Sequence, residues 1–212
     1  LDPAHPSLKV CGVTLRTDAE QLVAHRVPAL GVNFWPQSKR HCPPGEAAGF
    51  LPALKDRILR VGVFVNADPE EVARLFRDDL IDLAQFHGDE TEGECAAFAS
   101  RGLPFIKALG VKSAGDLDGA TGFHASAVLL DAHAPGVYGG TGRTIDWTTA
   151  RTFRDRHPAL PLILAGGITP ENAAAALEAV HPAALDVASG SESAPGIKDF
   201  HKVAALLAAC QG

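Results

Sequence analysis

The sequence predicts a (β/α)8 barrel, in which eight parallel strands alternate with helices around a closed ring. Eight short apolar runs recur along the 212 residues, and patterns typical of helices lie between them. The runs are nearly continuous in Val, Ile, Leu and Phe, which is typical of strands covered by helices. Strands that alternate with helices form parallel sheets, and eight such units favour a closed barrel, although that fold usually takes about 250 residues.

The predicted strands are spread over the whole chain. Their starts lie mostly about 23 residues apart, with longer gaps after the second and the sixth strand. We predict strands at residues 8–12, 29–34, 58–65, 81–87, 104–109, 127–132, 161–167 and 184–190.

Three of the intervening helices have visible boundaries. The sequence predicts them at residues 68–79, 169–180 and 198–210. Thr169 is predicted to cap its helix, with Pro170 as the first helical residue, where the missing N–H costs nothing. The segment at 113–123 is the weakest predicted helix because its glycines lower helix propensity.

An open doubly wound sheet is the alternative fold for the same alternation. The sequence has no Gly-x-Gly-x-x-Gly motif after the first strand, which the dinucleotide-binding form of that fold carries. No low-complexity segment or linker divides the chain. We therefore expect residues 1–212 to form a single barrel domain.

Composition and charge exclude several classes of partner. The formal net charge of −6 leaves no basic stripe for nucleic acid, although one loop could still bind a small phosphorylated ligand. No apolar run approaches the ~20 residues that span a bilayer, so we expect no membrane partner. The four cysteines show no CxxC spacing, and no His or carboxylate pair has metal-ligand spacing, so we expect no metal. With no signal-peptide pattern, we expect a reduced, cytoplasmic protein.

Polar residues at the strand ends are the catalytic candidates, because barrels of this type place the active site at the C-terminal ends of the strands. Asp131 ends a buried run, and burial favours a protonated carboxyl, so it is either a general acid or a structural loop cap. Cys11 ends the first run and is either a packing residue or a thiolate that acts as nucleophile or base. His87 and His133 are either helpers or structural residues.

Glycines mark the ends of the last two predicted strands. Gly166, Gly167, Ser189 and Gly190 fall on the loops where these barrels commonly bind phosphate. Glycine lets backbone N–H groups approach an anion closely, although glycines also simply end strands. A longer glycine loop at 136–147 is either a binding loop or a flexible connection.

Short segments in a fixed order resemble one enzyme family along essentially the whole chain. They are KVCG at 9–12, SKR at 38–40, VGVFVN at 61–66, QFHG at 85–88, LLDA at 129–132, YGGTGRTIDW at 138–147, LAGGITPEN at 164–172 and DVASGSESAPGIKD at 186–199. In their order and spacing these segments resemble the phosphoribosylanthranilate isomerase family.

The resemblance implies a tryptophan-biosynthesis enzyme built as one (β/α)8 barrel without a cofactor. Its implied reaction is the Amadori rearrangement of N-(5-phosphoribosyl)anthranilate, a small phosphosugar, to 1-(2-carboxyphenylamino)-1-deoxyribulose 5-phosphate. By position, Asp131 matches the general acid, Cys11 the general base, and Arg40 the arginine that binds the anthranilate carboxylate. An arginine suits this task because it donates two parallel hydrogen bonds to a carboxylate.

The remaining site residues are expected to contact the substrate. For phosphate they are Gly166, Gly167, Ser189 and Gly190; for the rest of the substrate they are Gly12, His87, Gly140, Thr141, Gly142 and Asp186. We expect Gly12 to leave room for the substrate behind Cys11. The apolar helix face at 203–210 could pack against the barrel or form a dimer, so we expect a monomer or a homodimer.

The chain departs from the family pattern at a few positions. Lys39 stands where the family commonly has proline, and Ala188 and Ser191 replace a serine and a valine near the phosphate segment. Two rival functions share the scaffold: a histidine-pathway sugar isomerase and a non-catalytic phosphosugar-binding barrel. The first typically has an aspartate where this chain has Cys11, and the second has no need of Cys11 and Asp131.

Overall fold

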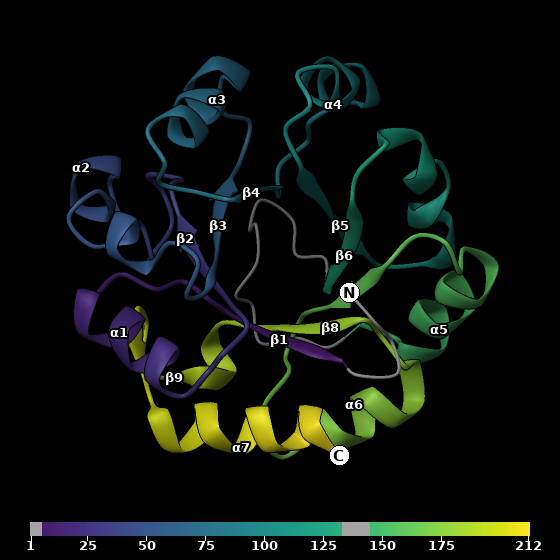
Figure 1. The fold of residues 1–212 in the computed structure, drawn as a ribbon. Helices are drawn as coiled ribbons and strands as arrows, with labels where there is room; N and C mark the ends of the chain where they lie inside the picture. The colour runs from purple at the N-terminus through teal and green to yellow at the C-terminus, as the bar shows by residue number, and fades with distance from the viewer. Residues whose placement is uncertain (1–5, 133–144) are drawn as a thin grey trace.

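The computed structural model describes residues 6–132 and 145–212, which form a closed barrel of eight parallel strands in sequence order. This confirms the predicted fold class. Figure 1 shows the ring of strands with helices around its outside. The strands are β1 (Ser7–Cys11), β2 (Ala29–Asn33), β3 (Leu59–Phe64), β4 (Leu83–Phe86), β5 (Phe105–Val111), β6 (Ala127–Ala132), β7 (Leu162–Leu164) and β8 (Ala184–Val187).

Helices and short 3-10 turns connect the strands on the outside of the ring. The α-helices are α1 (Arg16–Ala24), α2 (Pro44–Ala47), α3 (Pro69–Arg77), α4 (Glu92–Ala99), α5 (Trp147–Arg156), α6 (Ala173–Val180) and α7 (Phe200–Gln211). The 3-10 helices are η1 (Leu51–Leu54), η2 (Ala114–Leu117), η3 (Ala120–Phe123) and η4 (Ser189–Ser191). After β8, two further strands, β9 (Glu192–Ala194) and β10 (Ile197–Lys198), form a small antiparallel pair. None of the described helices could cross a membrane.

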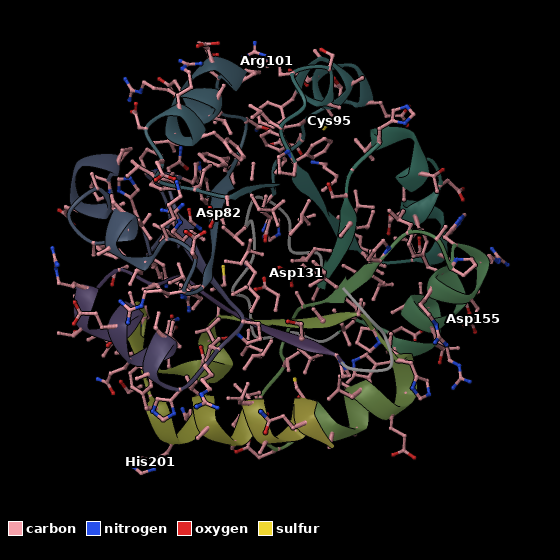
Figure 2. All side chains as sticks on the ribbon, viewed as in Figure 1. Asp82, Cys95, Arg101, Asp131, Asp155 and His201 are labelled. Carbon is pink, nitrogen blue, oxygen red and sulfur yellow. The ribbon has the colours of Figure 1, made fainter. Side chains whose placement is uncertain are left out.

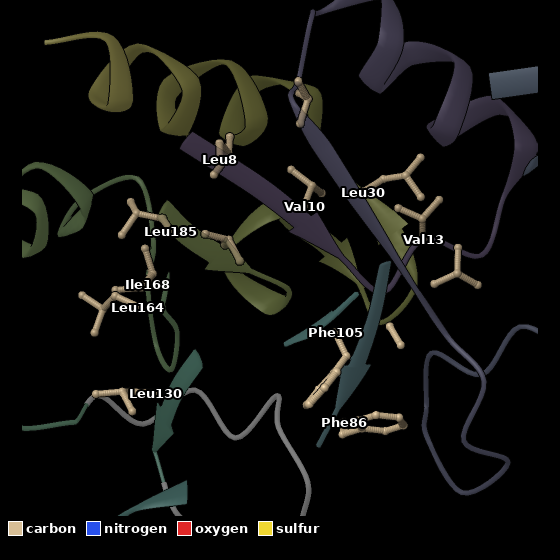
Figure 3. Packing of buried hydrophobic residues seen from close by; sticks show 14 of the residues in the cluster. Leu8, Val10, Val13, Leu30, Phe86, Phe105, Leu130, Leu164, Ile168 and Leu185 are labelled. Atoms are coloured by element: carbon tan, nitrogen blue, oxygen red, sulfur yellow. The ribbon is translucent and has the colours of Figure 1, made fainter. Parts of the chain in front are cut away.

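The barrel has two separate cores, because successive side chains of a strand point to opposite faces. One core fills the inside of the ring and contains Leu129, Ile163 and Ala184. The other lies between strands and helices and contains residues such as Leu8 and Leu130, as Figure 3 shows. This alternation decides which polar side chains face the inside of the ring.

By the same alternation, the polar candidates on β1, β6 and β8 face the inside of the barrel. Leu8 and Val10 pack against helices, so Lys9 and Cys11 point inward. Leu129 lies in the inner core, and Asp131 lies two residues further along the same face of β6. Asp186 likewise follows Ala184 on the inner face of β8.

Helix α6 begins later than predicted. The structure starts it at Ala173 with Asn172 as its N-cap residue, not at Pro170 with Thr169 as the cap. The Asn172 side chain accepts a hydrogen bond from the Thr169 N–H and donates one to the Gly167 carbonyl, both at 2.9 Å. Asn172 therefore closes the loop after β7 before the helix starts, which the predicted cap did not foresee.

The segment after β5 contains two 3-10 helices, η2 and η3, in place of an α-helix. Asp116 accepts hydrogen bonds from the backbone N–H groups of Lys112 and Ser113, at 2.8 and 2.7 Å, and so tightens the first turn. Gly119 has a φ of +83°, which ends that turn. The α-helix predicted at 113–123 is therefore wrong, and the low helix propensity of its glycines accounts for the difference.

Candidate active site

Cys11 and Lys9 share a confined space on the inner face of β1. The Cα partner of Cys11 on the neighbouring strand β2 is Gly31. A Cβ atom at Gly31 would lie 2.8 Å from Cys11 Sγ and 3.0 Å from Lys9 Nζ. The absent side chain of Gly31 therefore provides the space in which the thiol and the ammonium lie together.

Lys9 forms a buried ion pair across the seam between β1 and β8. Its Nζ lies 2.7 Å from Asp186 Oδ1, and the two residues are register partners. Burial disfavours the charged form of Lys9. The charges of Asp186 and Cys11 and their hydrogen bonds with Lys9 oppose this, and they hold the pKa of Lys9 above its ordinary value. Lys9 is therefore a fixed positive charge next to the thiol.

The environment of Cys11 combines opposing effects on its ionisation. Burial raises the pKa of the thiol above its ordinary value, and the charge of Asp186 acts in the same direction. Lys9 and Lys198 oppose these effects and favour the thiolate. Cys11 thus lies in a buried position where burial disfavours its ionised form and two nearby cations favour it.

Asp131 lies at the end of β6, where it is buried and held from two sides. Its Oδ1 accepts a hydrogen bond of 2.8 Å from the Ala132 N–H, and its Oδ2 lies 3.4 Å from His87 Nε2. His87 Nδ1 in turn lies 3.4 Å from Gln85 Nε2. Figure 2 shows Asp131 toward the middle of the ring of strands. The structure therefore brings together two residues, Asp131 and His87, that were predicted separately from the sequence.

Arg40 approaches the site from the loop after β2 and is held by Glu192. Arg40 Nε and Nη2 donate to Glu192 Oε1 and Oε2 at 2.8 and 2.7 Å. The Arg40 side chain passes directly over Gly12, where a Cβ atom would lie 2.3 Å from Arg40 Cδ. Gly12 has a φ of +76°, and the space in front of it is thus occupied by Arg40, whereas we expected it to be open to the substrate.

Glu192 and Lys198 lie in the same group of charged side chains as Arg40, although no pattern in the sequence indicated a role for them. Lys198 Nζ donates to Glu192 Oε1 at 2.8 Å and to the Cys11 carbonyl at 2.6 Å. Burial opposes the ionised form of Glu192, but Arg40 and Lys198 hold the pKa of this carboxyl below its ordinary value. The strands β9 and β10 pair these residues across the turn at Gly196, a motif that the segment APGIKD alone does not reveal.

The loops after β7 and β8 pack directly against each other. Gly166 and Gly167 adopt φ values of +80° and +62°. A Cβ atom at Gly190 would lie 1.9 Å from the Ile168 carbonyl oxygen, so only glycine fits there. Ser189 and Gly190 begin the turn η4. The structure thus brings the four residues predicted for phosphate binding onto two contacting loops.

Some predicted residues fall outside the part of the chain that the structure describes. They are His133, Gly140, Thr141 and Gly142. Within the described ranges, no group of three or more His, Cys, Asp or Glu side chains could hold a metal ion. The four cysteines are all buried, and none forms a disulfide in the structure.

Comparison with known proteins decides the family. Residues 8–209 match the family described as N-(5'phosphoribosyl)anthranilate (PRA) isomerase. The chain belongs to this family. The PRA isomerase of Syntrophus aciditrophicus is 42% identical over 202 residues, which cover 95% of this chain and 86% of the relative.

Solved structures of PRA isomerases have the same barrel. A structure of monomers of the dimeric enzyme from Thermotoga maritima superimposes with a TM-score of 0.85 at 33% identity and covers 98% of this chain and 99% of the relative. A PRA isomerase in complex with reduced 1-(o-carboxyphenylamino)-1-deoxyribulose 5-phosphate has the same TM-score, identity and coverage. The family and its isomerase activity, predicted from the order of short segments, are confirmed.

Proposed function

We propose that this protein, as a PRA isomerase, rearranges N-(5-phosphoribosyl)anthranilate with Asp131 as general acid and Cys11 as general base. One observation carries the proposal. A buried carboxyl and a buried thiol face the inside of the same barrel, from the C-terminal ends of β6 and β1. That is the end of the barrel at which such enzymes hold their substrates.

In the first step, Asp131 gives a proton to the ring oxygen of the ribose. The bond between C1 and the ring oxygen breaks, and the lone pair of the anilino nitrogen forms a C1=N double bond, which leaves a cationic Schiff base. His87, 3.4 Å from Asp131 Oδ2, restrains the carboxyl at this position. A positioned acid of this kind contributes about 10²–10⁴-fold to a rate.

In the second step, the Cys11 thiolate removes the proton from C2. The electron pair of the C2–H bond forms a C1=C2 double bond and neutralises the nitrogen, which gives an enolamine. The enol then loses its O–H proton while C1 gains one, and the aminoketose results. Lys9 stabilises the thiolate, because its ammonium is fixed beside Cys11 by Asp186.

The substrate has an anionic group at each end, the anthranilate carboxylate and the phosphate, and we assign each to a different part of the site. The guanidinium of Arg40 binds the anthranilate carboxylate. The contacting loops that carry Gly166, Gly167, Ser189 and Gly190 are placed for the phosphate, as is common after the last two strands of such barrels. We extend the proposal to a monomer or homodimer in the cytoplasm, where the four free thiols stay reduced.

The test is direct conversion of the substrate. Purified protein is mixed with N-(5-phosphoribosyl)anthranilate, and the loss of the substrate's fluorescence is followed. Formation of the aminoketose is measured by chromatography, because the two isomers have the same mass. We expect turnover without any added cofactor. A correctly folded sample that leaves the substrate unchanged would contradict the proposal and favour a binding protein.

A further inference from the structure

We propose that Glu192 is a positioning residue for the reaction, which holds Arg40 so that one edge of its guanidinium faces the substrate carboxylate. This inference rests on the proposed function. It adds a residue to which neither the sequence pattern nor the reaction chemistry had given a role, and it makes recognition of the carboxylate depend on a group that does not itself touch the substrate.

The contacts of Glu192 fix the guanidinium in one orientation. Both oxygens of the carboxylate accept from Arg40, at 2.8 and 2.7 Å, so that the pair is bidentate. Oε1 accepts in addition from the Gly196 N–H at 3.2 Å and from Lys198 Nζ at 2.8 Å. Glu192 and Lys198 are each only 5% exposed, so water competes little for these bonds.

This arrangement leaves one particular edge of Arg40 for a ligand. A guanidinium presents its five N–H groups along two edges that can bind a carboxylate, one with Nε and one between the two terminal nitrogens. Glu192 uses the edge with Nε. A substrate carboxylate would therefore bind end-on, across Nη1 and Nη2, and Glu192 determines which direction that edge faces.

The Glu192 side chain links Arg40, the residue proposed to bind the substrate carboxylate, with Cys11, the proposed base. Lys198 bridges from Glu192 to the carbonyl of Cys11, at 2.8 and 2.6 Å. Arg40 lies against Gly12, the next residue of the chain. The end of β1 is thus held between Arg40 and Lys198, both of which bind Glu192.

The charges of the cluster also suit an anionic ligand. Arg40 and Lys198 together carry two positive charges and Glu192 one negative charge, which leaves one positive charge in a buried site. A substrate carboxylate would neutralise it. If Glu192 only stabilised the fold, its replacement would leave the preference for a carboxylated ligand unchanged, so the two roles can be separated by experiment.

The test measures binding of two ligands that differ in one group. The first is reduced 1-(2-carboxyphenylamino)-1-deoxyribulose 5-phosphate, and the second is the same molecule with phenyl in place of carboxyphenyl. The ratio of their dissociation constants reports carboxylate recognition alone. The main variant is the double change Glu192→Gln with Lys198→Met, which keeps the net charge of the cluster at one positive charge.

We expect the preference of the double variant for the carboxylated ligand to be about tenfold smaller than that of wild type, the effect of losing one well-aligned, charge-assisted hydrogen bond. Affinity for the phenyl ligand should be unchanged. Glu192→Asp, which keeps the charge but shortens the side chain, should lower the ratio in the same direction and serves if the double variant does not fold. The matched control is Glu70→Gln, in an exposed carboxylate that also binds two arginines, Arg77 and Arg101. It should leave the ratio unchanged.

The outcomes separate the inference from the proposed function. If wild-type protein converts the substrate and prefers the carboxylated ligand, but folded Glu192 variants keep the full preference, only the role of Glu192 is wrong. If wild-type protein neither converts the substrate nor prefers the carboxylated ligand, the proposed function itself is wrong.

Discussion

Lys9 and Asp186 face each other across the seam that closes the barrel, with Nζ 2.7 Å from Oδ1. Both side chains are buried, so neither charge is screened by bulk water. The pair fixes an ammonium beside the thiol of Cys11 and balances its charge with a carboxylate. The Lys9–Asp186 pair thus couples closure of the barrel to the ionisation of the proposed base.

Replacing Lys9 should shift the pH dependence of turnover. In Lys9→Met the thiolate loses its nearest cation, so the pKa of Cys11, already raised by burial, rises further. The reaction needs the deprotonated form, so the rising limb of kcat against pH should move to higher pH. Because Asp186 alone would be an unpaired buried charge, the comparison includes Lys9→Met with Asp186→Asn. An unshifted limb in both variants would rule out this role for Lys9.

The two proposed catalytic residues should affect turnover without loss of fold. We expect Cys11→Ala and Asp131→Asn each to lower kcat by about 10²–10⁴-fold, the usual contribution of a positioned acid or base. The control is Cys95→Ala in α4, where burial raises the thiol pKa to about 11 and the side chain packs in the outer core. Circular dichroism checks the fold of each variant. Full activity of Asp131→Asn would show that the acid is another group.

Gly31 should be required for activity more than for stability. In Gly31→Ala the new methyl group would lie 2.8 Å from Cys11 Sγ and 3.0 Å from Lys9 Nζ, so both groups must move. We expect kcat to fall by about tenfold or more, since small displacements of catalytic groups are costly. Gly45→Ala is the matched control, because its Cβ would meet nothing within 4 Å. Equal kcat values for the two variants would argue against this packing role.

A stability prediction concerns the opposite end of the barrel. Arg60, fully buried on β3, donates to Asp82 Oδ1 at 2.7 Å and to Asp82 Oδ2 at 3.0 Å. We expect Asp82→Asn to lower the free energy of unfolding by about 2 kcal/mol, less than for a fully buried pair, because the Asp82 side chain is 32% exposed. Turnover at 25 °C should be unchanged, because this end of the barrel serves stability.

The same pair gives a pH dependence of stability with a defined sign. Burial opposes ionisation of Asp82, but Arg60 holds the pKa of this carboxyl below its ordinary value. The stabilisation is therefore complete above the unfolded-state pKa of about 4 and is lost as the pH falls through the lower folded-state pKa. Urea unfolding of wild type and Asp82→Asn should give a difference at pH 7 that shrinks below pH 4. A constant difference would contradict this origin.

The sequence allowed the barrel and the placement of Cys11 and Asp131 to be predicted, because strands covered on both faces are readable as apolar runs and catalytic groups follow strand ends. Other features depend on contacts distant in sequence. Lys9 lies within an apolar run, and only the register with β8 shows its partner Asp186. The bond from Glu192 to Arg40 spans 152 positions, and no local pattern encodes it.

The start of α6 shows a different reason for error. Thr169 and Pro170 are good helix-starting residues, and the prediction followed local propensity. The side chain of Asn172 uses its hydrogen bonds to close the loop that carries Gly167, so the helix begins at Ala173. The hydrogen bonds of Asn172 that close the proposed phosphate loop thus determine where the helix starts, and the local preference of Thr169 and Pro170 does not.

The assignment of Cys11 as the base is tested most directly by following the hydrogen on C2 of the substrate. N-(5-phosphoribosyl)anthranilate carrying deuterium at C2 is converted in ordinary water in single-turnover experiments, and release of the label into solvent is measured for wild type and Cys11→Ala. We predict that wild type releases the label as it forms product, with a slower step than for unlabelled substrate, and that Cys11→Ala releases it about 10²–10⁴-fold more slowly. Release of the label by Cys11→Ala at the wild-type rate would contradict the assignment of Cys11 as the base.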